Sequence, residues 1–269
     1  MKIGIISLGL IGGSLFKCLI ESEHEVYAVT RNKETIEKVK KYTPNISDDY
    51  SILKECEIIF VASPINKTVE ILDKLEKIVS NNTIVLDCAS VKEFITEKKR
   101  PYKFIGSHPM AGTEFTGFDA SFKELFEGAK WVLTPQENIG ETDISIAEDI
   151  IKLTGAKTII TTSKEHDIAV ALISHMPMLI SQAIFKTASD NELALKLASS
   201  GFRDMTRLAM SNPEMADDML NFNAKNIDIA VQMLLSSIRN LKTPKYFENC
   251  ADIKNIREKM YSKEGKNIL

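Results

Sequence analysis

The sequence predicts an α/β protein in which a parallel, doubly wound sheet is followed by an all-α domain. Two observations support this prediction. Over about the first 160 residues, short segments rich in Ile and Val alternate with helical patterns, as in sheets whose parallel strands are buried on both faces. After residue 162 the strand patterns stop and helical patterns continue. We therefore expect two domains, residues 1–162 and 163–269.

The expected elements follow one another in a regular order. The expected strands are Lys2–Ser7, Glu25–Thr30, Glu57–Ala62, Thr83–Asp87, Lys103–Gly106, Lys130–Thr134 and Lys157–Thr161. Helical patterns lie between the first of them, at Ser14–Ser22, Lys33–Tyr42 and Thr68–Val79. At the boundary, Thr162 and Glu165 have the spacing of a capping box, which predicts the start of a helix. The helical patterns beyond it are Asp167–Thr187, Asn191–Ser199, Met215–Arg239 and Cys250–Met260.

The composition is that of a globular protein and argues against several classes of partner. Of the 269 residues, 44% are hydrophobic and 26% are charged, and the net charge is −3, so we expect no basic surface for nucleic acid. No apolar run approaches the roughly 18–20 residues that span a bilayer, so we expect no membrane span, and Met1–Leu10 is interpreted as a strand rather than a signal segment. The widely spaced cysteines predict free thiols, no metal site and a cytoplasmic location: Cys18, Cys56, Cys88 and Cys250.

A glycine-rich turn follows the first expected strand and opens the first helix. It reads SLGLIGGS from Ser7 to Ser14, against the dinucleotide-binding fingerprint G-x-G-x-x-G, so Ser7 replaces the first glycine. Gly9 lets the backbone approach a pyrophosphate, and Gly12 lets the helix pack against the strand. A Rossmann-type domain is therefore predicted. Its expected cofactor-binding residues are Leu8, Gly9, Leu10, Ile11 and Gly12 and, after the third strand, Ala62, Ser63 and Pro64.

The end of the second expected strand favours NADP as the cofactor. Enzymes that prefer NAD carry Asp or Glu there, about 20 residues after the glycine turn, to bind the ribose hydroxyls. This sequence has Thr30 and Arg31 instead, and the Arg31 guanidinium can pair with a 2′-phosphate while Thr30 donates a hydrogen bond. We expect NADP to be preferred over NAD. In the alternative interpretation, Arg31 is a solvated surface charge.

Four segments place polar residues within apolar patterns. They are DCASVK at Asp87–Lys92, GSHPMAGTE at Gly106–Glu114, ISHMP at Ile173–Pro177 and GFRDMTR at Gly201–Arg207. With the glycine turn, and in the same order, they resemble the D-x-x-S-V-K, H-P-[MI]-A-G-[ST]-E, S-H-[LM]-P and G-F-[RK]-D-x-T-R segments of the prephenate/arogenate dehydrogenase family. The resemblance spans roughly residues 2–240. It implies oxidative decarboxylation of prephenate to 4-hydroxyphenylpyruvate in tyrosine biosynthesis, or of arogenate to tyrosine.

By this resemblance, the catalytic residues are His108 and Ser90. Hydride leaves the ring carbon that carries the hydroxyl, His108 accepts the hydroxyl proton, and Ser90 hydrogen-bonds that hydroxyl or His108. Loss of carbon dioxide makes the ring aromatic, so no metal is expected. A structural histidine at position 108 is the alternative. His24 and His166 are expected to be structural or exposed.

The two carboxylates of such a substrate require cations. Arg207 resembles the family's carboxylate anchor, and Arg203 lies four residues before it, so on one helix both would face the same way. His175 sits in an apolar helical pattern and by resemblance faces the substrate side chain; the alternative is a core histidine whose hydrogen bonds are satisfied within the protein. The expected substrate-binding residues are Arg207, Arg203, His175, Thr113 and Glu114.

The apolar faces of the second half exceed what one short bundle would bury, which predicts a homodimer. The sequence departs from the family pattern at Ser7, and Ala216 stands where some members have tryptophan. We expect no fused chorismate mutase segment and no C-terminal regulatory domain. The competing interpretations are another two-domain NADP dehydrogenase, of the β-hydroxyacid or imine-reductase kind, and a non-catalytic NADPH-sensing protein.

Overall fold

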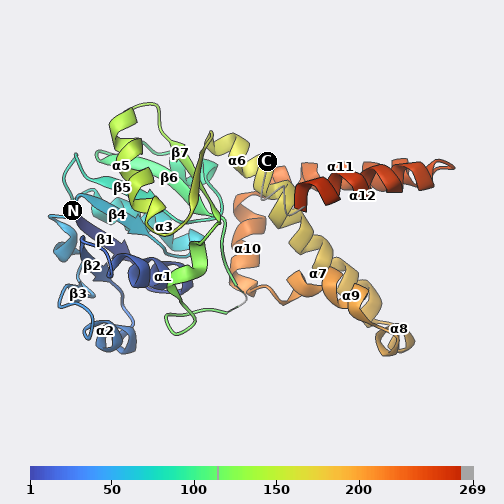
Figure 1. Cartoon of the computed structure of the whole chain (residues 1–269), viewed down its shortest axis with the longest axis horizontal. Helices are drawn as coiled ribbons and strands as arrows, with labels where there is room; N and C mark the ends of the chain where they lie inside the picture. The colour runs from blue at the N-terminus through green and yellow to red at the C-terminus, as the bar shows by residue number, and fades with distance from the viewer. Residues whose placement is uncertain (114, 262–269) are drawn as a thin grey trace.

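The computed structural model describes residues 1–113 and 115–261 and confirms the predicted fold class (Figure 1). An eight-stranded sheet with helices on both faces is followed by a helical part. The strand order is β3-β2-β1-β4-β5-β6-β7-β8. The strands are β1 (Lys2–Ile6), β2 (Glu25–Val29), β3 (Ile46–Ser47), β4 (Ile58–Val61), β5 (Ile84–Asp87), β6 (Lys103–Pro109), β7 (Lys130–Pro135) and β8 (Lys157–Ile160).

The order of the strands reverses at β1, which pairs in parallel with both β2 and β4. The carboxyl end of β1 is therefore the switch point at which doubly wound sheets bind ligands. The expectation of an all-parallel sheet was wrong at one position, because β6 and β7 pair antiparallel, with His108 opposite Val132. The described residues of their connection form the short 3-10 helix η2 (Lys123–Phe126) and no crossover helix, and such a connection returns the chain antiparallel.

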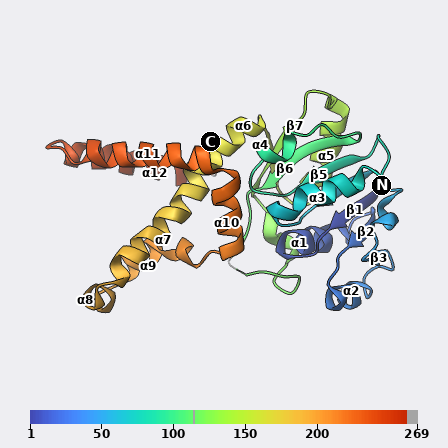
Figure 2. The same ribbon diagram turned by 180° about the vertical axis from the view of Figure 1, so that it is seen from behind.

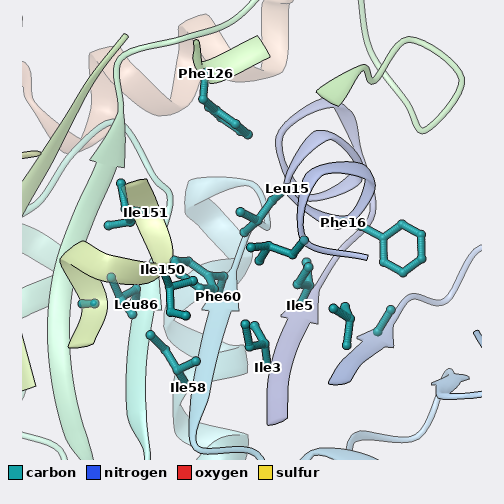
Figure 3. Close-up of a cluster of buried hydrophobic side chains, with 14 of the residues drawn as sticks. Ile3, Ile5, Leu15, Phe16, Ile58, Phe60, Leu86, Phe126, Ile150 and Ile151 are labelled. Carbon is teal, nitrogen blue, oxygen red and sulfur yellow. The ribbon is translucent and has the colours of Figure 1, made fainter. Parts of the chain in front are cut away.

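Each face of the sheet has its own apolar core. Successive strand residues point to opposite faces, so Ile5 packs on one side and Ile6 on the other. The first core joins the strands to α1 (Leu10–Leu19), α2 (Lys33–Val39) and α5 (Glu141–Lys152), as the side chains of Leu15 and Ile150 show in Figure 3. The second core lies under α3 (Ile65–Leu75) and α4 (Glu93–Thr96), on the face turned toward the viewer in Figure 2.

The chain changes from sheet to helix at Thr162, as the capping box predicts. The Thr162 hydroxyl accepts from the backbone N–H of Glu165 at 3.2 Å, and Glu165 accepts from the backbone N–H of Thr162. Most of the helices that follow extend away from the sheet in Figures 1 and 2, whereas the helix at Pro213–Phe222 lies beside the sheet part. They are α6 (Ser163–Val170), the π-helix η3 (Ala171–His175), α7 (Met176–Ser189), α8 (Glu192–Lys196), α9 (Ser200–Met205), the 3-10 helix η4 (Arg207–Met210), α10 (Pro213–Phe222), α11 (Ala224–Leu241) and α12 (Tyr246–Tyr261).

Two expectations about the helical part were wrong. The pattern at Met215–Arg239 predicts one helix, but the chain breaks at Asn223, whose φ of −124° and ψ of 22° lie outside the helical region. Arg203 and Arg207 were expected on one helix, but α9 ends at Met205 and Arg207 begins η4. Both breaks come from backbone turns at single residues that leave the apolar periodicity intact, so periodicity could not reveal them.

The helical run Ser163–Ser189 is long and apolar enough to cross a membrane by length and composition. It contains a window of mean hydropathy 1.8, of which only 28% is buried. The expectation that no segment reaches this length was therefore wrong here. Single polar residues such as Ser174 and His175 divide the segment into short apolar runs, although its mean hydropathy remains high. The core helix of a globular protein passes the same test. Apolar side chains such as Ile173 and Phe185 are exposed along this run.

Candidate active site

The glycine turn lies between β1 and α1, at the switch point of the sheet. A Cβ atom on Gly12 would overlap the carbonyl oxygen of Ser7 and lie 3.0 Å from Cβ of Ala62, so only glycine fits there. At Gly9 the situation is the opposite, because a Cβ there would meet no atom within 4 Å. Gly9 is the N-cap of α1 and provides no side-chain cap, so the N-terminal amides of α1 face this open space. The turn therefore fits a dinucleotide pyrophosphate.

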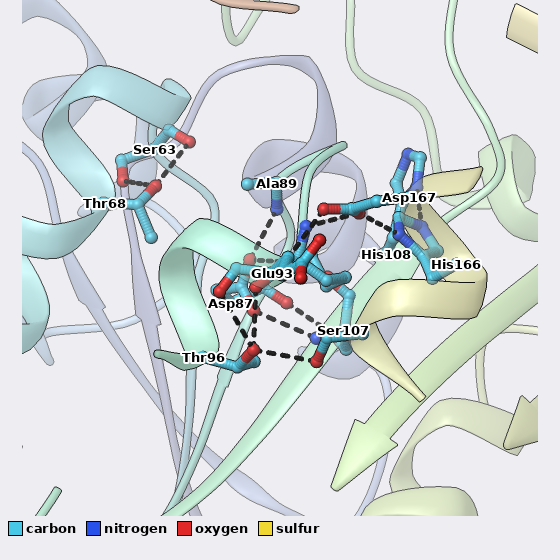
Figure 4. A network of polar contacts seen from close by, with 12 residues as sticks. Ser63, Thr68, Asp87, Ala89, Glu93, Thr96, Ser107, His108, His166 and Asp167 are labelled. Carbon is cyan, nitrogen blue, oxygen red and sulfur yellow. Dashed lines mark hydrogen bonds and ion pairs between the residues drawn. The ribbon is translucent and has the colours of Figure 1, made fainter. Parts of the chain in front are cut away.

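The other predicted cofactor residues lie at the same edge of the sheet. Thr30 and Arg31 follow β2, and Arg31 is exposed. Neither position between β2 and Asn32 carries a carboxylate, and Asn32 caps α2 by accepting from the Thr35 N–H at 3.0 Å. Pro64 is the N-cap of α3, and the hydroxyl of Ser63 lies 3.0 Å from that of Thr68 (Figure 4). Leu8 is buried, whereas Leu10 and Ile11 are half-buried.

His108, the predicted base, is part of a chain of three side chains shown in Figure 4. Its Nδ1 lies 2.9 Å from Nε2 of His166, and Nδ1 of His166 lies 2.7 Å from Oδ1 of Asp167. The two rings meet edge to face, with centroids 5.1 Å apart. His166 and Asp167 are both buried. The expectation that His166 is merely structural or exposed was wrong about its surroundings, because its ring contacts His108 directly.

Hydrogen bonds from the segment Asp87–Lys92 hold the residues next to His108 and His166 in place. The Lys92 ammonium forms an ion pair with Asp87 and donates to the carbonyl oxygen of Ser107 at 2.7 Å, and both side chains of the pair are fully buried. The Ser107 N–H donates to Asp87 at 2.9 Å. Asp167 accepts the backbone N–H groups of Lys92 at 2.7 Å and Glu93 at 2.8 Å. Lys92 thus holds the residue before His108 and the residue after His166.

His108 is held in its neutral form. Burial lowers the pKa of His108 well below its ordinary value of 6.5, and the nearby His166, Lys92 and His175 lower that pKa further. A neutral imidazole at physiological pH can accept a proton, as a general base must. Among the described residues, no group of three or more His, Cys, Asp or Glu side chains is arranged to hold a metal ion.

His175 is connected to the same network through Asn223. The Asn223 Nδ2 amide donates to the carbonyl oxygen of Asp167 at 2.9 Å and lies 3.1 Å from Nδ1 of His175. Because a carbonyl oxygen can only accept, this amide nitrogen is the donor, and Nδ1 of His175 is the acceptor. The hydrogen of neutral His175 then sits on Nε2, which is buried and has no partner within the described chain. Burial lowers the pKa of His175 to about 4.

Three residues of this hydrogen-bond network were not among the predicted site residues: His166, Asp167 and Asn223. The adjacent pair His166 and Asp167 lies in the middle of α6, and the contact of His166 with His108 spans 58 residues of sequence. Asn223 lies inside an apolar pattern. The one signal in the sequence was an adjacent His-Asp pair shortly after the capping box at Thr162.

The remaining predicted site residues make fewer contacts with the hydrogen-bond network around His108. Ser90 is half-buried, and in the described part of the chain its hydroxyl makes no hydrogen bond to His108. Thr113 is exposed and accepts from the Phe115 N–H at 3.2 Å, whereas Glu114 lies outside the described residues. Arg203 and Arg207 are exposed, and Nε of Arg203 lies 3.5 Å from the carboxylate of Asp204.

Two family models match the chain in succession. Residues 19–160 match "Prephenate dehydrogenase, nucleotide-binding domain", and residues 162–259 match "Prephenate dehydrogenase, dimerization domain". The division between the two matches coincides with the change from β8 to α6. Together they cover both structural parts of the chain.

Individual relatives agree with the family models. A prephenate dehydrogenase of Lactococcus lactis subsp. cremoris is 30% identical over 84% of this chain and 69% of its own length. The chain covers 64% of the prephenate dehydrogenase of Bacillus subtilis, so it spans about two thirds of the length of these two relatives.

Solved structures extend the likeness over the whole chain. The arogenate dehydrogenase of Synechocystis is 33% identical, with a TM-score of 0.83 and 100% coverage of both chains. The prephenate dehydrogenase of A. aeolicus, solved with hydroxyphenyl propionate and NAD+, is 26% identical, with a TM-score of 0.87 and coverage of 97% and 98%. The chain belongs to the prephenate dehydrogenase family.

Proposed function

We propose that this chain is a prephenate dehydrogenase, which converts prephenate to 4-hydroxyphenylpyruvate and carbon dioxide with a nicotinamide cofactor. The observation that carries the proposal is the contact of 2.9 Å between Nδ1 of His108 and Nε2 of His166, which leaves the other nitrogen of His108 for a substrate. Burial also lowers the pKa of His108 well below its ordinary value, which favours the neutral form that a base requires. This base lies on β6 at the edge of the sheet where the glycine turn opens.

A bound nicotinamide supplies the acceptor for the hydride that leaves the carbinol carbon. The residues of this chain do the rest. The turn from Leu8 to Gly12 and the segment Ala62–Pro64 hold the dinucleotide, while His108 takes the hydroxyl proton and Ser90 hydrogen-bonds the same hydroxyl. The α1 amides at Gly9 provide the partial positive charge that a pyrophosphate requires.

Arginines and one histidine would orient the substrate. Arg207 pairs with one carboxylate, and Arg203 is available to the second anion, since both guanidinium groups are exposed. His175 offers its unpartnered Nε2 to the substrate side chain. Thr113 and Glu114, in the segment after His108, complete the expected substrate-binding set.

The preferred cofactor is NADP. The end of β2 carries Thr30 and the exposed Arg31, and no acid stands there to accept from a ribose or to repel a 2′-phosphate. The relative from A. aeolicus was solved with NAD+, so NAD is the alternative that a comparison of the two cofactors decides.

The helical part is proposed to form a homodimer in a cytoplasmic enzyme. The second family model is a dimerization domain, and the helices expose many large apolar side chains that a second copy would cover, including Ile173, Phe185, Leu197 and Met233. A second copy that covers these side chains would also explain why the helical run Ser163–Ser189 is apolar, without any membrane. We place the domain boundary between residues 162 and 163, where the capping box begins α6.

One set of assays tests the proposal. The purified protein is mixed with prephenate or arogenate and with NADP or NAD, and formation of the reduced cofactor is followed. We expect the highest kcat/KM with prephenate and NADP. A higher kcat/KM with arogenate would reassign the substrate to the class of the Synechocystis relative, and no reduced cofactor from any pair would overturn the function.

A further inference from the structure

We propose that His166 and Asp167 are positioning residues that fix which nitrogen of His108 carries hydrogen and that store the proton His108 removes. The proposal rests on the proposed dehydrogenase reaction. It concerns two adjacent residues of α6. A hydrogen bond of 2.9 Å joins His108 to His166, and one of 2.7 Å joins His166 to Asp167.

Asp167 determines which atom donates in each hydrogen bond of the series from His108 through His166 to Asp167. Its carboxylate can only accept, and it is held in place by two backbone N–H groups, of Lys92 at 2.7 Å and Glu93 at 2.8 Å. Nδ1 of His166 therefore donates to Asp167, and Nε2 of neutral His166 carries a lone pair. Nδ1 of His108 must then donate to that lone pair. The hydrogen of neutral His108 is thus on Nδ1, and its Nε2 is the bare nitrogen that accepts the substrate proton.

The surroundings favour moving the proton away from His108. Among the described residues, the charged and titratable groups that face His108 are His166 from α6, Lys92 from the segment before α4 and His175 from η3, and each disfavours a positive charge on it. His166 instead faces the carboxylate of Asp167. When Nε2 of His108 takes a proton, its Nδ1 hydrogen can pass to Nε2 of His166. The positive charge then lies beside Asp167 rather than beside Lys92.

The reaction returns this proton. Hydride transfer breaks the carbinol C–H bond and reduces the cofactor, while the hydroxyl O–H bond breaks and its proton goes to Nε2 of His108. Loss of carbon dioxide leaves its bonding electron pair in the ring, so that the former hydroxyl oxygen becomes a phenolate. The product carries a phenol at that oxygen, so one proton must come back to it. His166 and Asp167 hold the proton between the two events, and no outside acid is needed.

Two substitutions of His166 separate positioning from storage. In His166→Gln, an amide oxygen still accepts from Nδ1 of His108 but cannot take up a proton. In His166→Phe, both functions are lost. We expect kcat to fall for both variants, further for His166→Phe, by about 10²–10⁴-fold. KM and the dissociation constant of the cofactor should stay within about threefold of the parent.

Asp167→Asn tests whether Asp167 sets the donors of this hydrogen-bond series. The Asp167 carboxylate accepts from the backbone N–H groups of Lys92 and Glu93 and from His166, and an amide oxygen cannot accept from all three. Asp218→Asn is the matched control. Asp218 is also a buried carboxylate of the helical part that accepts a backbone N–H from the sheet part, that of Asn66 at 3.4 Å, but the structure gives it no contact with His108, His166 or His175 among the described residues. We expect kcat to fall with Asp167→Asn and to be retained with Asp218→Asn at a temperature where both are folded. A kcat within threefold of the parent for both His166→Phe and Asp167→Asn would overturn the proposal.

A measurement without substrate keeps this test independent of the proposed function. The chain has 4 histidines, so long-range nitrogen–proton correlation spectra can assign each ring. We expect hydrogen on Nδ1 and a bare Nε2 in His108 of the parent protein, and loss of this tautomer in Asp167→Asn. Hydrogen on Nε2 of parent His108 would overturn the proposal. If the tautomer is as expected but neither substrate is oxidised, the reaction has been misassigned and the positioning by His166 and Asp167 stands.

Discussion

The backbone of Gly12 packs directly against the carbonyl group of Ser7, so that any side chain at position 12 would overlap it. We expect Gly12→Ala to lower the melting temperature, because either the turn or the start of α1 must move. Gly9→Ala is the matched substitution: its methyl group meets no protein atom within 4 Å. It should leave the melting temperature within a few degrees and weaken cofactor binding at least tenfold, as titration calorimetry would measure. Equal effects of both variants on stability would contradict this assignment of the two glycines.

Ser7 itself adopts a backbone conformation that disfavours its side chain. Its φ of 69° lies in the left-handed region, and Ser7 is the one non-glycine residue with positive φ in the described chain. Ser7→Gly should relieve this strain, and the gain is reduced by the greater freedom of glycine in the unfolded state. We expect a net increase in the free energy of unfolding of up to about 1 kcal/mol. Ser7→Ala, which keeps a Cβ, should give no increase in urea unfolding.

Arg31 is expected to determine the choice of cofactor. It is exposed after β2, where no carboxylate stands. Arg31→Ala should lower kcat/KM for NADP by about tenfold or more, since a charge-assisted pair to the 2′-phosphate contributes on the order of 1.5–3 kcal/mol. The value for NAD, which has no such phosphate, should hardly change. An unchanged ratio of the two efficiencies would show that Arg31 is only a surface charge.

Much of this site could be predicted from local sequence, and the rest depends on contacts between distant segments. The glycine turn, the strand that begins at Lys103 and the start of α6 follow from patterns within a few residues, and the structure has them all, although β6 runs to Pro109 and so includes His108, beyond the predicted end at Gly106. The bond between His108 and His166 joins β6 to α6, and its geometry depends on how the helical part docks on the sheet. The break at Asn223 is likewise set by its bonds to Asp167 and His175, which no local propensity contains.

The buried pair of Asp87 and Lys92 should be far more sensitive to the loss of one partner than to the loss of both. Both side chains are fully buried, and Asp87 also accepts the N–H groups of Ser107 and Ala89. Lys92→Met leaves the carboxylate without its cation, at a cost of about 3–5 kcal/mol of unfolding free energy. Asp87→Asn with Lys92→Met removes both charges while the amide keeps one acceptor, and should recover part of that loss. A double-mutant cycle by urea unfolding measures this coupling, and additive effects would contradict it.

His175 should make the protein less stable as the pH falls from about 6.5 to about 4. Burial lowers its pKa from 6.5 to about 4, so within this range the unfolded chain binds a proton that the folded chain does not. Acid therefore favours unfolding there, by up to about 3 kcal/mol at the lower end, and His108 acts in the same direction because its pKa is also lowered. His175→Gln, which keeps a polar group beside Asn223 but does not titrate, should flatten the slope of unfolding free energy against pH. Parallel slopes for the parent and His175→Gln would mean that His175 does not stay neutral in the folded protein, and its role as a buried hydrogen-bond donor to the substrate would fall with it.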